Sequence, residues 1–89
     1  MKTKSIEKIS GKEKTSKSHQ LILFNDDVNT FDDVIELLVK YCNQNEIQAE
    51  QCAMLVHHTG RCSIKEGSFE ELFLIGEMLS VNGLTVEIK

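Results

Sequence analysis

Three short polar side chains, Asn25, Asp26 and Asp27, come directly after an apolar run, and their types could do chemistry. Amide and carboxylate oxygens at the end of a strand can accept hydrogen bonds from a cation or an ammonium group. The same residue types are common in turns, because Asn and Asp side chains bond the nearby backbone. Taken alone, the cluster therefore favours a turn over a binding site.

A second candidate is the pair His57 and His58, which lies near the end of an expected helix, where the helix dipole favours cations. Adjacent helical residues point about 100° apart, so the two imidazoles cannot share one role. His57 is four residues after Ala53, with Val56 beside that face, so it lies on a face of small and apolar residues. We expect His58 to point toward water.

Two other kinds of site would use the same histidines. A zinc site would combine them with Cys52 and Cys62, but Cys52 and His57 are five residues apart on one helix and no close cysteine pair anchors the set. A Cys-His-Asp hydrolase would need a nucleophile at a recognisable sharp turn, which the sequence does not show. Together with Cys42 there are three cysteines, an odd number, so we expect reduced thiols in a cytoplasmic protein. Since neither kind of site is supported, we expect no metal, no cofactor and no catalytic residue.

The spacing of apolar residues predicts the elements that must position these side chains. Strands are expected over residues 20–25, 61–65 and 84–88, and helices over 31–42, 47–58 and from Ser68 to about 81. Thr30 has the position of an N-cap, with Asp33 three residues later. Residues 52–56 are apolar on all sides, which predicts a mostly buried second helix. The order predicts an α+β fold, a βααβαβ sandwich with a three-stranded antiparallel sheet and three helices on one face.

Length and charge limit the classes of function. The chain has 89 residues, enough for one small domain. Residues 1–20 carry six Lys against two Glu, whereas residues 21–89 carry four basic against twelve acidic residues. We therefore expect a disordered basic tail over 1–19 and an acidic folded core over 20–89, for which nucleic acid and membranes are poor partners. We expect no signal peptide and no membrane span.

The polar cluster, the first helix and the end of the second helix together resemble the ClpS family of adaptors for the Clp protease. The pattern consists of Asn25-Asp26-Asp27 after a strand, a helix that opens at Phe31, and Val56-His57-x-x-Gly60 where the second helix ends. The resemblance covers roughly residues 20–89. It implies a monomeric, non-enzymatic recognition component of the bacterial N-end rule.

Such adaptors bind substrates whose first residue is Leu, Phe, Tyr or Trp. They deliver these N-degron substrates to the N-terminal domain of a ClpA- or ClpC-type AAA+ unfoldase. An N-terminal extension of the adaptor has a role in this delivery. The resemblance implies that Asn25, Asp26 and His57 hold the α-amino group of the substrate. It also implies a supporting turn formed by Asp27 and Thr30. The pocket for the first side chain is implied to be lined by Phe31, Val34, Ala53, Val56 and Leu84.

This chain departs from the family pattern at two pocket positions and in its third helix. The family often has Met where Phe31 stands and a larger residue where Ala53 stands. The third helix is shorter and lacks the Glu-Thr-Lys run near the surface that docks the unfoldase. A protein-docking module without an amine pocket stays open, since the layout also resembles the C-terminal domain of the ribosomal stalk protein. A small hydrolase or metalloenzyme is the third alternative.

Overall fold

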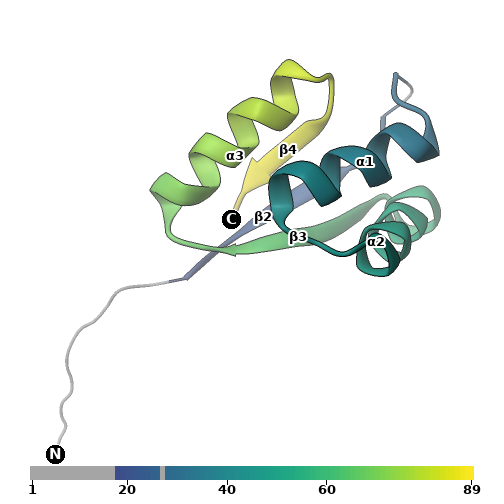
Figure 1. Cartoon of the computed structure of the whole chain (residues 1–89). Helices are drawn as coiled ribbons and strands as arrows, with labels where there is room; N and C mark the ends of the chain where they lie inside the picture. The colour runs from purple at the N-terminus through teal and green to yellow at the C-terminus, as the bar shows by residue number, and fades with distance from the viewer. Residues whose placement is uncertain (1–17, 27) are drawn as a thin grey trace, which may run out of the picture.

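The computed structural model describes residues 18–26 and 28–89. Its elements are β2 (His19–Phe24), α1 (Phe31–Cys42), α2 (Glu46–Thr59), β3 (Arg61–Gly67), α3 (Phe69–Val81) and β4 (Thr85–Ile88) (Figure 1). The predicted βααβαβ order is confirmed, and each boundary lies within two residues of its expected position. The predicted tail lies outside the described residues except for Ser18 and His19, and His19 is already the first residue of β2.

The sheet has the order β3-β2-β4, and β2 pairs antiparallel with both neighbours. Phe24, the last residue of β2, pairs with Arg61 on one side and with Thr85 on the other. Arg61 begins β3 one residue after Gly60, the C-cap residue that follows α2. The register therefore places the polar turn after Phe24 next to the end of α2.

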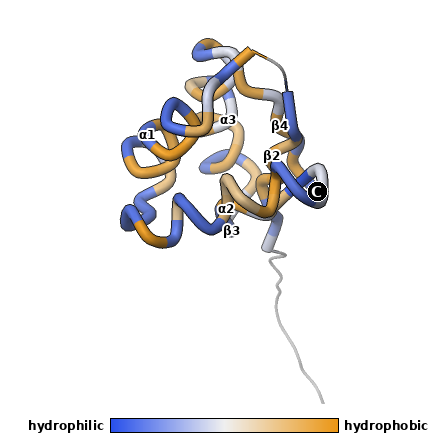
Figure 2. The backbone as a smooth tube through the Cα atoms, turned by 90° about the vertical axis from the view of Figure 1, so that its right-hand side faces the viewer, coloured by the Kyte–Doolittle hydropathy of each residue, from blue (hydrophilic) through white to orange (hydrophobic). Residues whose placement is uncertain are grey.

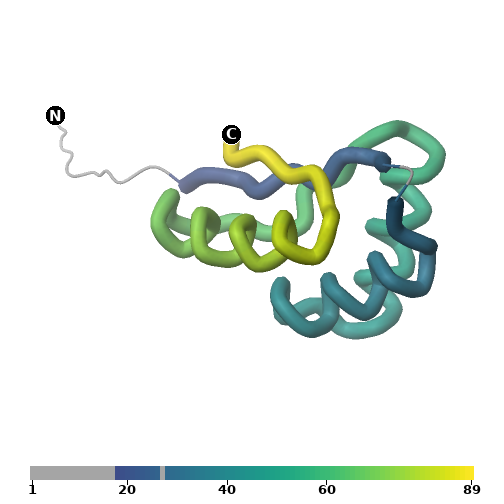
Figure 3. The backbone as a smooth tube through the Cα atoms, turned by 90° about the horizontal axis from the view of Figure 1, so that it is seen from above, coloured from purple at the N-terminus to yellow at the C-terminus, as the bar shows by residue number. Residues whose placement is uncertain are grey.

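All three helices lie on the same face of the sheet, as the sequence predicts (Figure 3). Along α1, hydrophobic and hydrophilic residues alternate, as expected for a helix that covers a sheet with one side (Figure 2). The core lies between the helices and the sheet. Its largest fully buried side chains come from β2, α1 and α3 and are Leu21, Leu23, Leu38, Leu72 and Leu79.

The ends of α1 and α2 are fixed by the caps that the sequence suggests. Thr30 Oγ1 accepts a hydrogen bond of 3.1 Å from the backbone N–H of Asp33, and Asp33 Oδ2 accepts one of 3.4 Å from the backbone N–H of Thr30. This reciprocal pair is a capping box, which starts α1 at Phe31. At the C-terminal end of α2, Gly60 adopts a left-handed conformation with φ of 95° and caps the helix.

The prediction that α2 is mostly buried is wrong. Only Ala49, Ala53 and Val56 of this helix are buried. Ile47, Met54 and Leu55 are exposed, with exposed fractions of 68%, 47% and 49%. A small domain has one layer of helices on its sheet, so the outer side of α2 has no further layer to cover it.

No helix in the described part of the chain combines the length and the apolar character needed to cross a membrane.

Candidate functional site

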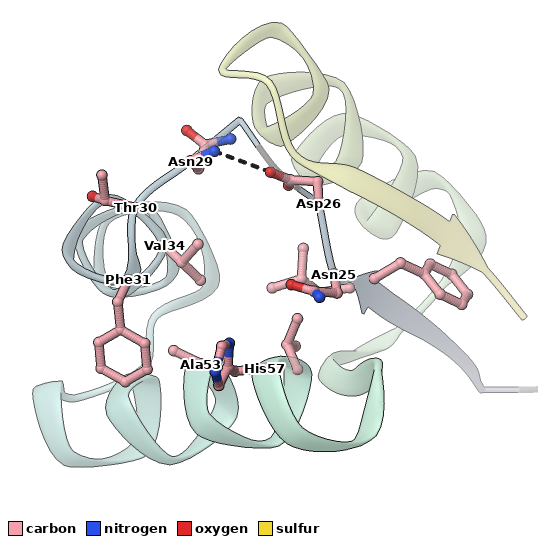
Figure 4. Close-up of a pocket in the computed structure, with 11 residues that line it drawn as sticks. Asn25, Asp26, Asn29, Thr30, Phe31, Val34, Ala53 and His57 are labelled. Atoms are coloured by element: carbon pink, nitrogen blue, oxygen red, sulfur yellow. Dashed lines mark hydrogen bonds between the residues drawn. The ribbon is translucent and has the colours of Figure 1, made fainter.

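A cavity of about 110 Å³ lies where the turn after β2, the start of α1 and the last turns of α2 meet (Figure 4). Eight of the ten site residues named from the sequence line it: Asn25, Asp26, Thr30, Phe31, Val34, Ala53, Val56 and His57. The geometry thus brings these side chains together, although they come from two separate stretches of the chain, residues 25–34 and 53–57.

The other two named residues are placed elsewhere or not described. Leu84 is buried in the core, with 4% of its surface exposed, and is not among the residues that line the cavity. Asp27 lies outside the described residues. The roles suggested for these two residues stay predictions, as do those of the eight residues that line the cavity.

The turn after β2 is joined directly to the end of α2. The backbone N–H of Asn25 donates a hydrogen bond of 3.0 Å to the carbonyl oxygen of Gly60. The backbone N–H of Gly60 in turn donates one of 3.0 Å to the carbonyl oxygen of Val56. This chain of backbone bonds fixes the polar turn relative to the helix that carries His57.

Asp26 is both a turn residue and a lining residue of the cavity. Its Oδ1 accepts hydrogen bonds from the backbone N–H of Val28 at 2.8 Å and of Asn29 at 3.0 Å. The turn interpretation of the polar cluster is thus correct for this oxygen. A carboxylate has a second oxygen, so Asp26 can shape the turn and still accept a hydrogen bond from a ligand.

The cavity has a polar side and an apolar side. In Figure 4, Asn25 and Val34 point into the space between the turn and the helices, and His57 rises toward it from α2. Ala53 and Val56 form a buried wall, with exposed fractions of 4% and 5%. Such a site can bind a group that carries hydrogen-bond donors next to an apolar side chain.

Phe31 lies at the edge of the cavity, where α1 begins. Its side chain extends from α1 toward α2 (Figure 4), and 39% of its surface is exposed. The ring therefore contributes to the cavity while remaining in contact with solvent. Phe31 thus stands at the rim of the cavity, and its role in binding stays a prediction.

Sequence reasoning missed three lining residues, Leu23, Phe24 and Asn29. Leu23 and Phe24 belong to β2, and the apolar pattern assigns them to the core, so nothing in the sequence singled them out. Asn29 carried a usable signal, because it is a short polar residue three positions after Asp26 in the same turn. Its Nδ2 is buried and has no hydrogen-bond partner within residues 18–26 and 28–89.

The residues of the zinc alternative separate into two groups. Cys52 and Cys62 lie together, with their Sγ atoms 3.2 Å apart, whereas His57 lines the cavity. His58 contacts the His57 ring edge-to-face, with ring centroids 5.2 Å apart, and is not a lining residue. Within residues 18–26 and 28–89, no three His, Cys, Asp or Glu side chains gather closely enough to hold a metal ion.

Solved structures show the same fold. The chain superposes on the structure of Agrobacterium tumefaciens ClpS2 bound to L-phenylalaninamide with a TM-score of 0.73. The match covers 84% of this chain and 98% of that chain at 16% sequence identity. At this identity the likeness establishes the fold alone, an α+β domain of the kind found in ClpS2.

Sequence comparison establishes the family. The family described as "ATP-dependent Clp protease adaptor protein ClpS" matches residues 14–79, about three quarters of the 89 residues. The chain therefore belongs to the ClpS family, and the resemblance seen in the motif is confirmed.

Curated relatives named "ATP-dependent Clp protease adapter protein ClpS" come from Campylobacter jejuni. The one from subspecies doylei is 40% identical over 60 residues, which is 67% of this chain and 60% of the relative. One from subspecies jejuni strain 81-176 is 46% identical over 44 residues, which is 49% of this chain and 46% of the relative. The matched part thus spans about half to three fifths of the length of these relatives.

Proposed function

We propose that this protein is a monomeric cytoplasmic adaptor that binds other proteins by their N-terminal residue. The substrates are proteins that begin with Leu, Phe, Tyr or Trp, and the adaptor delivers them to the N-terminal domain of a ClpA- or ClpC-type unfoldase for degradation. The observation that carries the proposal is a single small cavity that places hydrogen-bond acceptors beside an apolar wall. The work is binding and delivery, so the proposal requires no catalytic residue and no cofactor.

The polar side of the cavity suits a free α-ammonium group. That group has three N–H donors, and Asn25, Asp26 and His57 can supply an amide oxygen, a carboxylate oxygen and an imidazole nitrogen as acceptors. Hydrogen bonds that involve a charged group are about twice as strong as neutral ones. A substrate whose α-amine is acetylated loses the charge and two of the donors, so it should bind poorly.

The apolar side of the cavity suits one apolar side chain. Phe31, Val34, Ala53 and Val56 line it, and the cavity has a volume of about 110 Å³. The related ClpS2 structure supports this proposal, because L-phenylalaninamide carries a free α-amine and an aromatic side chain. We propose that the first side chain of a substrate occupies the corresponding space here.

The surface proposed for the unfoldase is the outer side of α3. This helix exposes several large apolar side chains, with Phe69, Phe73, Leu74 and Met78 between 44% and 67% exposed. The rings of Phe69 and Phe73 stack, with centroids 6.2 Å apart, and form an apolar ledge. Contiguous apolar surface of this kind marks protein-interaction sites. The same ledge would serve a docking module without an amine pocket, which is the alternative function.

A binding experiment separates the two functions. A fluorescent Phe-initiated peptide is titrated with the protein, and the same peptide with an acetylated N-terminus is the matched control. We expect the free amine to bind at least about tenfold more tightly, since acetylation removes charge-assisted hydrogen bonds. Equal affinity of the two peptides, or binding of neither, would contradict the adaptor function and favour the docking module.

A further inference from the structure

Two thiols face each other between α2 and β3. Cys62 Sγ donates to Cys52 Sγ across 3.2 Å, and both cysteines are half-buried and not in a disulfide. The amide of Gln44 also donates to Cys52 Sγ at 3.6 Å and to the carbonyl oxygen of Ile64 at 2.9 Å. Cys52 is therefore held between a second thiol and an amide donor that is itself anchored to β3.

The segment between these two thiols contains one wall of the cavity. Residues 52–62 include Ala53, Val56 and His57, all of which line the cavity. They also include Gly60, whose carbonyl oxygen accepts the hydrogen bond from Asn25. A covalent bond between the two ends of this segment would close a ring around the residues that form the wall.

We propose that Cys52 and Cys62 form a reversible disulfide under peroxide, and that this bond restricts the motion of the cavity wall that carries His57. Disulfide formation requires the two sulfur atoms to approach from 3.2 Å to about 2.05 Å. The claim about the wall rests on the proposed peptide-binding function, whereas the claim about the disulfide does not.

The reaction takes two steps. The Cys52 thiolate attacks one oxygen of hydrogen peroxide, the O–O bond breaks, and the products are a Cys52 sulfenic acid and, after proton uptake, one water. The Cys62 sulfur then attacks the sulfenic sulfur, and the hydroxyl leaves as a second water with the thiol proton. The two thiols together lose two electrons and two protons, and the peroxide is reduced to two waters. A dithiol reductant reverses the change.

The order of the two thiols follows from their surroundings. Burial, followed by the hydrogen bond to Cys52, raises the pKa of the Cys62 thiol to about 12. Cys62 thus keeps its proton and acts as the donor. Cys52 accepts hydrogen bonds from both Cys62 and Gln44, so its sulfur is the acceptor of the pair while the Cys62 thiol is the donor. We therefore assign the first attack to Cys52 and the second to Cys62.

Cys42 is the competing third thiol. It is buried, with 4% of its surface exposed, and burial raises its pKa to about 11, with smaller effects from Lys65 and Cys52. A buried thiol of this kind reacts slowly with peroxide. Cys42→Ala is accordingly a matched variant that removes the competing thiol and keeps the proposed pair.

Mass spectrometry tests the disulfide directly on the full chain. Cys42→Ala is treated with hydrogen peroxide, remaining thiols are alkylated, and the protein is digested with trypsin without reduction. We expect a mass loss of about 2 Da in the intact protein and a cross-link between tryptic peptides 41–61 and 62–65, both reversed by dithiothreitol. Cys52→Ser and Cys62→Ser should show no loss. Addition of oxygen to Cys52 without a cross-link would overturn the proposal, as would preferential pairing of Cys52 with Cys42 in the wild type.

A binding measurement tests the effect on the wall. We expect oxidised Cys42→Ala to melt at least about 5 °C higher than the reduced form and to release a Phe-initiated peptide about twofold to fivefold more slowly. An unchanged release rate despite a complete cross-link would overturn the effect on the wall. Failure of both forms to bind any Phe-initiated peptide would instead count against the proposed function, while the mass measurement would still decide the disulfide.

Discussion

The backbone N–H of Asn25 and the carbonyl oxygen of Gly60 lie 3.0 Å apart, and this hydrogen bond connects the two halves of the candidate site. Asn25 follows β2, whereas Gly60 caps the end of α2, so the bond joins residues that are 35 positions apart in the sequence. The antiparallel pairing of Phe24 with Arg61 brings the two residues together. The geometry of the site is thus a consequence of sheet register more than of any local motif.

The first prediction concerns the proposed amine contacts. We expect His57→Ala to weaken binding of a Phe-initiated peptide about tenfold to a hundredfold, because a hydrogen bond to a charged group contributes roughly 1.5–3 kcal/mol. His58→Ala is the matched control, since this neighbouring imidazole is not a lining residue. It should change the affinity by less than about twofold. Fluorescence anisotropy measures both, and equal losses at the two positions would refute the assignment of His57.

A second prediction separates the two roles of Asp26. Asp26→Ala removes both the proposed contact and the acceptor of two turn hydrogen bonds, so it should lower affinity and stability together. Asp26→Asn keeps an oxygen at Oδ1 for the turn and removes the negative charge. We expect it to retain most of the stability and to lose about tenfold in peptide affinity. Urea denaturation and anisotropy measure the two effects, and full affinity in Asp26→Asn would show that the charge is not used.

A third prediction uses two glycines in different conformations. Gly60 has φ of 95° with open space around a would-be Cβ, so Gly60→Ala should cost about 1–2 kcal/mol of unfolding free energy through backbone strain alone. Gly76 lies in α3, where an added Cβ would meet Leu21 and Val86 at ordinary contact distances of 3.5 and 3.6 Å. Gly76→Ala should therefore stabilise the protein by about 0.5–1 kcal/mol. Urea denaturation measures the unfolding free energy of both variants, and stabilisation by Gly60→Ala would contradict this account.

The helices and their caps could be predicted from the sequence because the interactions involved are local. The Thr30 and Asp33 capping box and the left-handed Gly60 depend on residues within one turn of the helix end. The exposure of α2 could not be predicted, because residues 52–56 do not reveal which sides of the helix find a neighbour. The closeness of Cys52 and Cys62 likewise depends on how α2 packs on β3.

The candidate site was predictable in its polar part and less so in its walls. Asn25, Asp26 and His57 belong to motifs that can be read along the chain. Which apolar residues line the cavity depends on how the packed side chains are oriented. Leu84 lies in the core, whereas Phe24, which belongs to no motif, lines the cavity. The proposed binding to an unfoldase involves the surface of a second protein, which the sequence of this chain does not describe.

A fourth prediction concerns the N-terminal segment. Every residue that lines the cavity lies at or after Leu23, and all described strand pairs lie at or after His19. We therefore expect deletion of residues 1–17 to shift the melting temperature by less than about 2 °C and to leave peptide affinity unchanged. Delivery to an unfoldase, in which the family resemblance implies a role for this segment, is expected to be lost. Thermal unfolding, anisotropy and a degradation assay are the measurements, and a large drop in melting temperature would show a structural role.

The last prediction concerns the choice of first residue, which we assign to Phe31 and Ala53. Phe31 lies at the rim of the cavity and Ala53 is in the buried wall on α2. Relative to the Met and the larger residue that the family resemblance implies at these positions, a rigid ring is added on one side and volume is freed on the other. The pocket for the first side chain should therefore change its position more than its volume. A flat ring favours aromatic partners, whereas Met adapts to many shapes by rotation.

We therefore expect Phe-initiated peptides to bind more tightly than Leu-initiated ones by about 0.5–1.5 kcal/mol, the contribution of one aromatic pair. Ile- and Val-initiated peptides should bind poorly, because the Phe31 ring crowds a branched Cβ. Phe31→Ala should admit Ile while changing Phe affinity by only a few-fold. Phe31→Met is the matched control, because a flexible side chain should lessen the preference for Phe over Leu. Anisotropy titrations with peptides that differ only in their first residue measure these affinities. Tighter binding of Leu than of Phe would refute the aromatic preference, and an unchanged profile in Phe31→Ala would show that Phe31 contributes only to the packing of α1.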